Sequence, residues 1–456
     1  MLATSILTWV LLLTRTDTTY VLCHMNSELA LAFRVDGMSC IFAGLVSILW
    51  PLASMYGFEY MQHEERPNTF FSYYTMSYAV TLAVAFSANL FSLYVFYECL
   101  TLITLPLVIH KKDTMSIRAG RKYLTFSISG AALAFIALVF IIYYGTTTDF
   151  VLGGVLDAEK ISGMEELLKF VFLLAFVGFR HESGCFPQMY AWLPAASVAP
   201  TPVTALLHAV AVVNAGAYAV LRVIYYSFGA SFLYGTWAQT VALLLSCFTI
   251  LFGSTMAVRE QHFKRRLAYS TISNLSYMLM GAALMTPDGM TGSLSHLVIH
   301  GVIKITLFYC AGAILIKTGK EYVQDLRGYS RIMPATCGIF LLGSIALVGT
   351  PPLAGFVSKW NLLTAASATE LPMGTVAIVC LIISAILTAI YLFTAALPMY
   401  FRPLNADQAQ LAGQKLDPSW MMLVPMGILC ALMIGLGLWS QPLVTFLRNI
   451  SAGVIF

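Results

Sequence analysis

Long apolar stretches separated by short polar connections run through the whole sequence. A helix needs roughly 20 apolar residues to cross the hydrocarbon core of a bilayer, and many of these stretches reach or approach that length. They lie near residues 37–58, 73–88, 89–110, 122–144, 164–180, 202–226, 233–256, 267–286, 292–316, 335–350, 353–368, 373–400 and 419–440. The pattern predicts an all-α integral membrane protein with about 13–14 transmembrane helices.

The opening apolar stretch, Leu2 to Leu13, is shorter than a full span and is followed by Arg15, Asp17 and His24. A cleaved signal peptide is one interpretation, but no small-residue cleavage site stands out. We therefore expect a short first span.

The composition narrows the possible functions. Hydrophobic residues make up 59% of the 456 residues and charged residues 10%, whereas a soluble domain carries about 25% charged residues. The net charge is only +4 and most of the cations lie in short connections, which leaves no basic face for nucleic acid. The nine cysteines are scattered, with no C-x-x-C pair or Cys/His cluster. We therefore expect no metal, iron–sulfur cluster, disulfide framework or other cofactor in this chain.

Lysine and arginine alternate between connections, and this alternation predicts the topology. The cation-rich connections carry Lys111, Lys112, Arg118, Arg121 and Lys122, then Arg259, Lys264, Arg265 and Arg266, then Lys317, Lys320, Arg327 and Arg331, then Arg402 and Lys415. The connections between them, such as 146–163 and 286–292, hold acidic residues and few cations. By the positive-inside rule, we expect the cation-rich set to face the cytoplasm.

A few ionisable residues fall inside the predicted spans. Each one costs at least about 2.5–3.5 kcal/mol in the bilayer and is by default a functional-site hypothesis. Glu98 lies near the middle of the uncharged run NLFSLYVFYECLTLITLPLVI. A protonated carboxyl that only hydrogen-bonds to a neighbouring helix is the structural alternative for this residue.

A second group of ionisable residues follows a helical repeat. His296, His300 and Lys304 stand four residues apart in SLSHLVIHGVIKITLFYCAGAI, which places all three on one helix face. Three titratable groups about 6 Å apart per step form a possible proton or cation path. Ordinary core histidines, or a metal held by the two imidazoles, are the alternatives, and no acidic or thiol ligand is near in sequence.

Two segments contain clusters of proline. In LVGTPPLAGFVSKW, Gly349, Pro351 and Pro352 precede Lys359. Prolines remove backbone donors, and a membrane helix tolerates such a break only where protein or water satisfies the freed groups. We therefore predict a discontinuous span with a lysine at its break.

The other proline-rich segment is GFRHESGCFPQMYAWLPAASVAPTPVTALLHAV, where Pro187 follows Arg180, His181 and Glu182. His208 opens the next span, which also contains the uncharged Asn214. Two proline-broken segments in corresponding halves favour an inverted-repeat transporter with sites near the membrane midplane.

Five segments together resemble a known family. They are FYECLTL, WLPAASVAPTPVTALLHAVAVVNAGAYAVLRV, FKRRLAYSTISNLSYMLMG, HLVIHGVIKITLFYCAGAI and GTPPLAGFVSKW. The sequence is similar to the antiporter-like subunits shared by respiratory complex I, Mrp-type cation/proton antiporters and energy-converting membrane-bound hydrogenases, and it resembles the D-type component of the Mrp antiporters most. The similarity extends from about Asp36 to about residue 400.

The resemblance implies two inverted five-helix repeats, each with one proline-broken helix. Mapped onto this chain, it divides residues 1–72 (N-terminal helices, the first short or missing), 73–227 (first repeat), 228–400 (second repeat) and 401–456 (C-terminal helix and tail). It also implies a midplane relay for protons or sodium, which falls on Glu98, Glu182, His208, His296, His300, Lys304 and Lys359.

The sequence departs from the family pattern in its first half. The resemblance implies one lysine at Glu182 and another at Asn214, and neither is present. Arg180 and His181 are the possible charge partners that could replace them, because a buried charge is costly without a partner. The second half keeps its full set of charges.

We therefore expect a proton or sodium/proton translocating subunit of a complex I-like, hydrogenase-like or Mrp-like assembly, whose partners are other membrane subunits, the lipid bilayer and the transported ions. Such a subunit is not catalytic alone. The alternatives are a structural or regulatory membrane-arm subunit with a non-conducting N-terminal half, or a membrane partner in another solute uptake complex. The expected location is a bacterial or archaeal cell membrane, in preference to the mitochondrial inner membrane.

Overall fold

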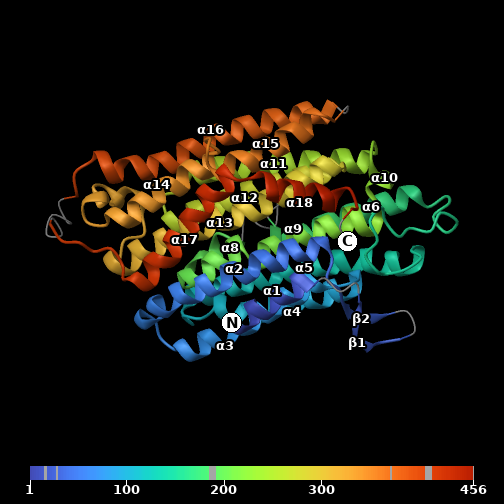
Figure 1. Ribbon diagram of the computed structural model, residues 1–456, viewed down its shortest axis with the longest axis horizontal. Coiled ribbons are helices and arrows are strands. Elements are labelled where there is room, and N and C mark those ends of the chain that lie inside the picture. The colour runs from blue at the N-terminus through green and yellow to red at the C-terminus, as the bar shows by residue number, and fades with distance from the viewer. Residues whose placement is uncertain (15–17, 27–28, 184–191, 370–371, 406–412, 455–456) are drawn as a thin grey trace.

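A computed structural model describes the chain apart from residues 15–17, 27–28, 184–191, 370–371, 406–412 and 455–456. Figure 1 shows a bundle with α16 along one edge, α3 and α4 along the opposite edge, and α13 between them. Its helices are α1 Leu2–Thr14, α2 Gly37–Tyr60, α3 Pro67–Phe86, α4 Leu90–Val108, α5 Thr114–Tyr144, α6 Glu165–Ser183, α8 Thr201–Ala209, α9 Val212–Arg222, α10 Ala230–Leu233, α11 Trp237–Arg259, α12 Phe263–Ala283, α13 Pro287–Thr318, α14 Pro334–Val348, α15 Ala354–Ser367, α16 Pro372–Phe401, α17 Trp420–Leu438 and α18 Gln441–Ser451.

The chain is a mostly helical membrane protein, as its apolar pattern predicts. Within the described residues, eight helices are long and apolar enough to cross a membrane: Gly37–His63, Leu90–Val108, Thr114–Tyr144, Thr201–Phe228, Trp237–Arg259, Pro287–Thr318, Pro372–Phe401 and Trp420–Leu438. The outer face of α16 carries Ile382, Ile386 and Ile390, which are 50%, 57% and 43% exposed. Such a face suits contact with lipid or with another membrane protein rather than with water.

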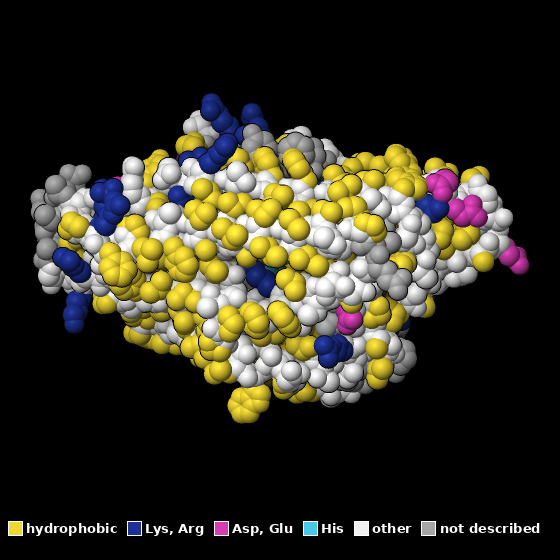
Figure 2. Space-filling model, turned by 90° about the horizontal axis from the view of Figure 1, so that it is seen from above, with side chains coloured by type: hydrophobic (Ala, Val, Ile, Leu, Met, Phe, Trp, Pro, Cys, Tyr) yellow, Lys and Arg dark blue, Asp and Glu magenta, His cyan; other side chains and the backbone are white. Residues whose placement is uncertain are grey.

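Charge separates along the long axis of the molecule. In Figure 2, the visible Asp and Glu side chains gather mainly at the right-hand end, while Lys and Arg lie mostly toward the left-hand end and along the upper edge, with a few near the middle and at the right. Hydrophobic side chains cover much of the surface between the two ends. This distribution agrees with the alternation of cation-rich and cation-poor connections along the sequence.

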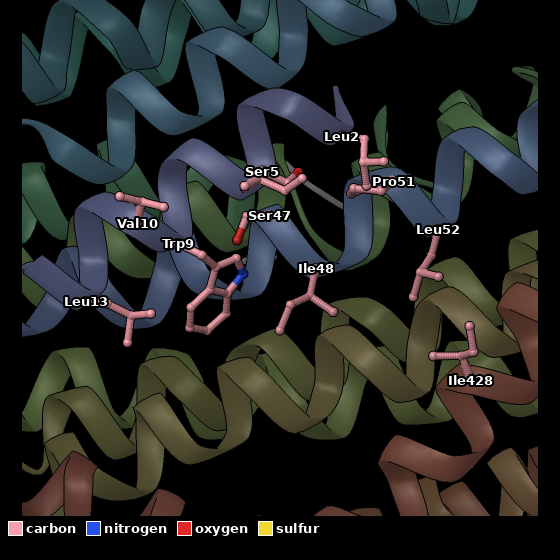
Figure 3. A pocket seen from close by; sticks show the side chains of 11 residues that line it. Leu2, Ser5, Trp9, Val10, Leu13, Ser47, Ile48, Pro51, Leu52 and Ile428 are labelled. Atoms are coloured by element: carbon pink, nitrogen blue, oxygen red, sulfur yellow. The ribbon is translucent and has the colours of Figure 1, made fainter.

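The N-terminal part contains a short helix, where the apolar stretch Leu2 to Leu13 leads us to expect a short span, and a hairpin that the sequence pattern does not reveal. Helix α1 packs on α2, and its Ser5 hydroxyl hydrogen-bonds the Tyr78 hydroxyl at 2.6 Å. Strands β1 (Tyr20–His24) and β2 (Ala30–Phe33) then pair antiparallel. Beside α1 lies an open apolar groove of about 460 Å³ lined by residues such as Trp9 and Pro51 (Figure 3). Helix α1 thus covers part of α2, while β2 packs against α4.

The proline-rich segment near Lys359 is discontinuous. Helix α14 ends at Val348, Gly349 follows with φ of 95°, and α15 begins at Ala354. Pro351 and Pro352 lie in the interruption. Because proline removes a backbone donor and Gly349 adopts a left-handed conformation, the helix cannot continue through this segment.

The first half contains an interruption that the sequence pattern does not indicate. The predicted span 202–226 is continuous in pattern, but the chain leaves α8 after Ala209 and enters α9 at Val212. The side chain of Asn214 donates to the freed carbonyl of Ala209 at 2.8 Å. The predicted span 202–226 is therefore present as Thr201–Phe228, with an interruption that has no proline and at which a side-chain amide satisfies a backbone carbonyl.

Helix α13 forms the centre of the second half. It packs against α2, α8, α12, α14, α15, α17 and α18. Almost every residue from Gly289 to Ile314 is buried. Any ionisable side chain on α13 is therefore enclosed by protein, so its partners must come from these neighbours.

Candidate functional site

Helix α13 carries three buried ionisable side chains along one face. His296, His300 and Lys304 are 2%, 0% and 0% exposed. The helix is regular through this region, so four-residue steps place the three groups in a row about 6 Å apart. The imidazole rings of His296 and His300 stack with centroids 5.9 Å apart.

Lys304 ends the row against helix α12. Its Nζ donates to the carbonyl of Leu267 at 2.9 Å and to the hydroxyl of Ser270 at 2.7 Å. The Ser270 hydroxyl is 2.5 Å from the Tyr391 hydroxyl on α16. The ammonium thus contacts neutral oxygen atoms, and within the described residues it has no carboxylate at ion-pair distance. These contacts satisfy the amine without fixing its charge.

At the other end of the row, His296 connects α13 to the helix after the break. Its Nδ1 is 3.0 Å from the Ser358 hydroxyl on α15. The ring of Tyr277 lies edge-on, with centroids 5.4 Å apart. Both ring nitrogens of His300 lack a hydrogen-bond partner within the described part of the chain. Such buried nitrogens suit water or a transient proton better than a fixed bond.

Lys359 lies on α15, and its side chain reaches back to the interruption between α14 and α15. Its Nζ donates to the carbonyls of Leu347 at 2.7 Å and Val348 at 3.0 Å. It also lies 5.4 Å from the centre of the Tyr277 ring. Leu347 and Val348 end α14, where carbonyls lack helical partners and the helix dipole favours a cation. The break therefore creates the site that holds the lysine.

His208 approaches this row from the first half. Its ring stacks on Phe308 of α13 with centroids 5.0 Å apart. Phe308 lies one turn beyond Lys304, so α8 brings His208 next to the buried row. Neither ring nitrogen of His208 has a partner in the described part of the chain. Asn214 instead closes the α8–α9 break.

The remaining residues predicted for the relay do not join this group. Glu98 is half-buried on α4, and no described residue hydrogen-bonds or ion-pairs with its carboxylate. Arg180 is 1% exposed, and its guanidinium lies 5.0 Å from the centre of the Phe176 ring. The side chains of Glu182 and His181, and Pro187 as a whole, lie outside the described residues. The role of Arg180 and His181 as charge partners in place of the missing lysines therefore stays a prediction.

Several polar neighbours of the buried charges are absent from the sequence prediction. Ser270, Tyr277 and Ser358 contact the lysines or His296, and Tyr391 contacts Ser270. A signal is present for two of them in the run AYSTISNLSYM, which is rich in hydroxyl and amide groups within a helix that is buried on all sides. Buried polar groups require partners, so such a run indicates a polar interior.

A separate buried ion pair lies toward the cation-poor end. Asp36 caps α2, and its carboxylate accepts from Arg222 of α9 at 2.7 Å. Burial raises the pKa of Asp36, but the Arg222 guanidinium and the Ser39 backbone N–H lower it, and the net pKa lies below its usual value. The rings of Phe150, Tyr218 and Tyr226 surround the guanidinium at 4.8–5.1 Å. Both side chains are buried, so loss of either partner would leave an uncompensated charge inside the protein.

Two family models match the sequence. Residues 87–388, more than half of the chain, match the model described as NADH:quinone oxidoreductase/Mrp antiporter, TM. Residues 24–71 match the N-terminal model of chain 5 of NADH-ubiquinone oxidoreductase, complex I. Together the two models include every residue of the buried row and its broken helix.

Individual proteins give the same picture. The chain is 29% identical over 415 residues to NADH-quinone oxidoreductase subunit N of Desulforudis audaxviator, covering 88% of this chain and 80% of that one. It is 30% identical over 344 residues to hydrogenase-4 component B of Escherichia coli, covering 72% of this chain but only 50% of that protein. A chain in the solved Mrp complex of Dietzia sp. DQ12-45-1b superposes with a TM-score of 0.83 at 20% identity over 99% of this chain and 90% of that chain. These relatives belong to different complexes, so the nearer resemblance to the D-type Mrp component stays a prediction.

Proposed function

We propose an ion-translocating function from one premise: the chain belongs to the family of proton antiporter-like membrane subunits that includes those of complex I and Mrp antiporters. It is an antiporter-like subunit of a multi-subunit membrane complex. We propose that protons, or protons in exchange for sodium, move along the row from His208 and Lys304 through His300 and His296 to Lys359. The burial of His208, His296, His300 and Lys304 and the stacking of His296 on His300 support this path.

The single observation that carries the proposal is the neutral environment of Lys304. An ammonium paired with a buried carboxylate is held in its charged form, because separating the pair leaves an uncompensated charge. Lys304 contacts one carbonyl and one hydroxyl, and both can also accept a hydrogen bond from an uncharged amine. The residue can therefore gain and lose a proton without breaking its contacts.

His300 links Lys304 to His296. A neutral imidazole accepts a proton at one nitrogen and releases one from the other, which suits a step between two donors. Both of its nitrogens are unpartnered in the described part of the chain. At the far end, Lys359 receives the charge where the carbonyls of Leu347 and Val348 stabilise it.

The first half of the chain supports a more limited role. Where the resemblance implies a lysine, Asn214 is committed to the Ala209 carbonyl. Glu98 has no cation beside it in the described residues and is half-buried on α4. A structural or regulatory first half, joined to a conducting second half, is the second candidate, and a residue of an adjoining membrane protein would then face Glu98.

The proposal is tested with the assembled complex reconstituted into vesicles. Lys304→Met and Lys359→Met keep side-chain volume but remove the charge, so we expect each to lower proton translocation at least tenfold while the complex still assembles. Lys122→Met, an exposed lysine on α5, is the matched control and should stay within twofold of the parent. Assays with and without sodium distinguish proton transport from exchange. Parental rates in both buried variants would contradict the relay.

A further inference from the structure

Lys264 is a buried cation that the relay described above does not use. It is the second residue of α12, at the cation-rich face, and is 5% exposed. Its Nζ donates to the carbonyl of Ala199 at 3.2 Å, and within the described residues no carboxylate approaches it to ion-pair distance. Its neighbours differ, since Arg265 pairs with Glu260 at 3.8 Å and Arg266 donates to backbone carbonyls.

Toward the surface, Lys264 faces a small group of charged side chains. The charged side chains that act on its ammonium are Lys111, Glu321 and Glu64. Glu64 pairs with Lys111 at 3.4 Å, and Glu321 pairs with His262 at 3.4 Å. The side chains of Lys111 and Glu321 are 40% and 44% exposed, so this group is open to water. We call these two ion pairs the charged rim, and buried Lys264 lies close to it.

Toward the interior, Lys264 is connected to the start of α8 through the Ala199 carbonyl. The Ala199 carbonyl that accepts from Lys264 also accepts from the Thr204 hydroxyl at 3.0 Å. Thr204 lies one turn before His208 on α8, so both side chains lie on the same face of that helix. The two cations whose charges act on His208 are Lys304 and Lys264. The Ala199 carbonyl and Thr204 thus connect Lys264, beside the charged rim, to the part of α8 that carries His208.

We infer that Lys264 is the entry residue through which protons pass between the cation-rich face and His208. This inference rests on the proposed function and adds its access point. A hydronium ion at the rim protonates the Lys264 amine and becomes water. The resulting ammonium then gives one proton, through a hydroxyl or a water molecule, to a ring nitrogen of His208 and returns to the amine. The Thr204 hydroxyl shares the Ala199 carbonyl with Lys264. The Thr201 hydroxyl, one turn earlier on α8 than Ala205, donates to the Tyr60 hydroxyl at 3.1 Å.

A purely structural role predicts a different result. In that case Lys264 only holds the Ala199 carbonyl at the start of α8, and any cation with a donor at the same place would serve. Lys264→Arg keeps the charge and a donor but cannot release a proton, because a guanidinium stays protonated at every accessible pH. Lys264→Met removes both properties at similar volume.

The test uses the whole complex in oriented vesicles, with a pH step applied at the cation-rich face. We expect Lys264→Met and Lys264→Arg to slow proton translocation at least fivefold and to change the dependence of the rate on pH. Arg265→Met, at the next position and half-exposed, should stay within twofold of the parent. Assembly is measured by native gel electrophoresis for every variant, and Lys264→Arg decides the question if Lys264→Met fails to assemble.

Two outcomes overturn the entry role. Parental rates in Lys264→Arg with a parental pH profile would make Lys264 a structural pin, and parental rates in both variants would remove any role in transport. Lys304→Met, measured in parallel, separates this inference from the proposed function. If Lys304→Met abolishes transport while both Lys264 variants conduct normally, only the entry role is lost; if Lys304→Met also conducts normally, the relay itself is lost.

Discussion

Buried Lys304 and half-buried Lys359 have no carboxylate partners among the described residues, and each uses a different kind of acceptor. Lys304 donates to a carbonyl and a hydroxyl of α12, and Lys359 donates to the last two carbonyls of α14. Hydrogen bonds from a charged donor contribute about 1.5–3 kcal/mol each. Such contacts offset part of the cost of burial, and they leave the lysines able to exchange protons.

The serine beside Lys304 gives a test of this view. In Ser270→Ala the ammonium loses one of its two acceptors in a fully buried site, a loss that costs about 1–3 kcal/mol. We expect translocation to fall at least fivefold, with a changed dependence on pH. The measurement is proton uptake into vesicles containing the complex.

The matched control for that variant is Ser246→Ala. Ser246 is equally buried on α11, and its hydroxyl donates to the carbonyl of Ala242 one turn earlier. We expect this variant to translocate protons at the parental rate. Equal rates in Ser270→Ala and Ser246→Ala would show that the hydroxyl contact contributes nothing to transport.

At the scale of elements, the two helix interruptions are closed in different ways. Between α14 and α15, Lys359 binds the freed carbonyls and Gly349 turns the chain. Between α8 and α9, the Asn214 amide binds the freed carbonyl of Ala209. A cation closes the break beside the buried row, and a neutral amide closes the other, which agrees with a conducting second half and a more structural first half.

The α14–α15 break requires close backbone packing. A Cβ at Gly355 would lie 1.7 Å from the Ala346 carbonyl oxygen, which is backbone and cannot move aside cheaply. We expect Gly355→Ala to destabilise the complex by about 1–3 kcal/mol or more, as overpacked cores do, and to slow translocation because the Lys359 site shifts. Thermal unfolding of the purified complex in detergent measures the first effect.

Gly427→Ala on α17 is the control for the same substitution. A Cβ at Gly427 would meet nothing within 4 Å, and alanine favours a helix more than glycine does. We expect an unchanged or slightly higher unfolding temperature. A loss of stability in Gly427→Ala equal to that in Gly355→Ala would mean that the close approach of α14 and α15 is not the cause.

At the scale of the whole molecule, the Asp36–Arg222 pair joins the N-terminal helices to the end of the first half, although 186 positions separate the two residues. Removing one partner of a buried pair costs about 3–5 kcal/mol, because the other charge is left uncompensated. We expect Asp36→Asn to lower the unfolding temperature strongly. Asp113→Asn, at a surface helix cap bonded to Ser116, should change the unfolding temperature little, because asparagine caps a helix about as well as aspartate.

The same pair predicts how stability depends on pH. Burial raises the pKa of Asp36, but Arg222 and the Ser39 N–H outweigh it, so the folded-state pKa lies below the usual value. The stabilisation by this carboxylate is therefore fully present above its unfolded pKa of about 3.9 and is lost as the pH falls through the lower folded value. We expect this contribution to be constant from pH 5 to pH 8. A loss of the difference between the parent and Asp36→Asn within that range would contradict the assignment.

The sequence by itself determines the membrane class, most of the spans and the row on α13. These depend on local composition and helical repeat, so His296, His300 and Lys304 fall on one face in any α-helix of that register. The break at Gly349 to Pro352 is likewise local, because proline and a left-handed glycine stop a helix whatever surrounds it.

Tertiary structure alone decides what those side chains touch. Ser270 and Ser358 become partners of Lys304 and His296 because α12 and α15 pack against α13, and Tyr391 becomes a partner of Ser270 because α16 packs against α12. The α8–α9 break depends on one amide reaching back to Ala209, and Lys264 resembles any loop cation until folding buries it under the surface charges. A charge in hydrocarbon needs partners, and partners far apart in sequence are set by packing rather than by pattern.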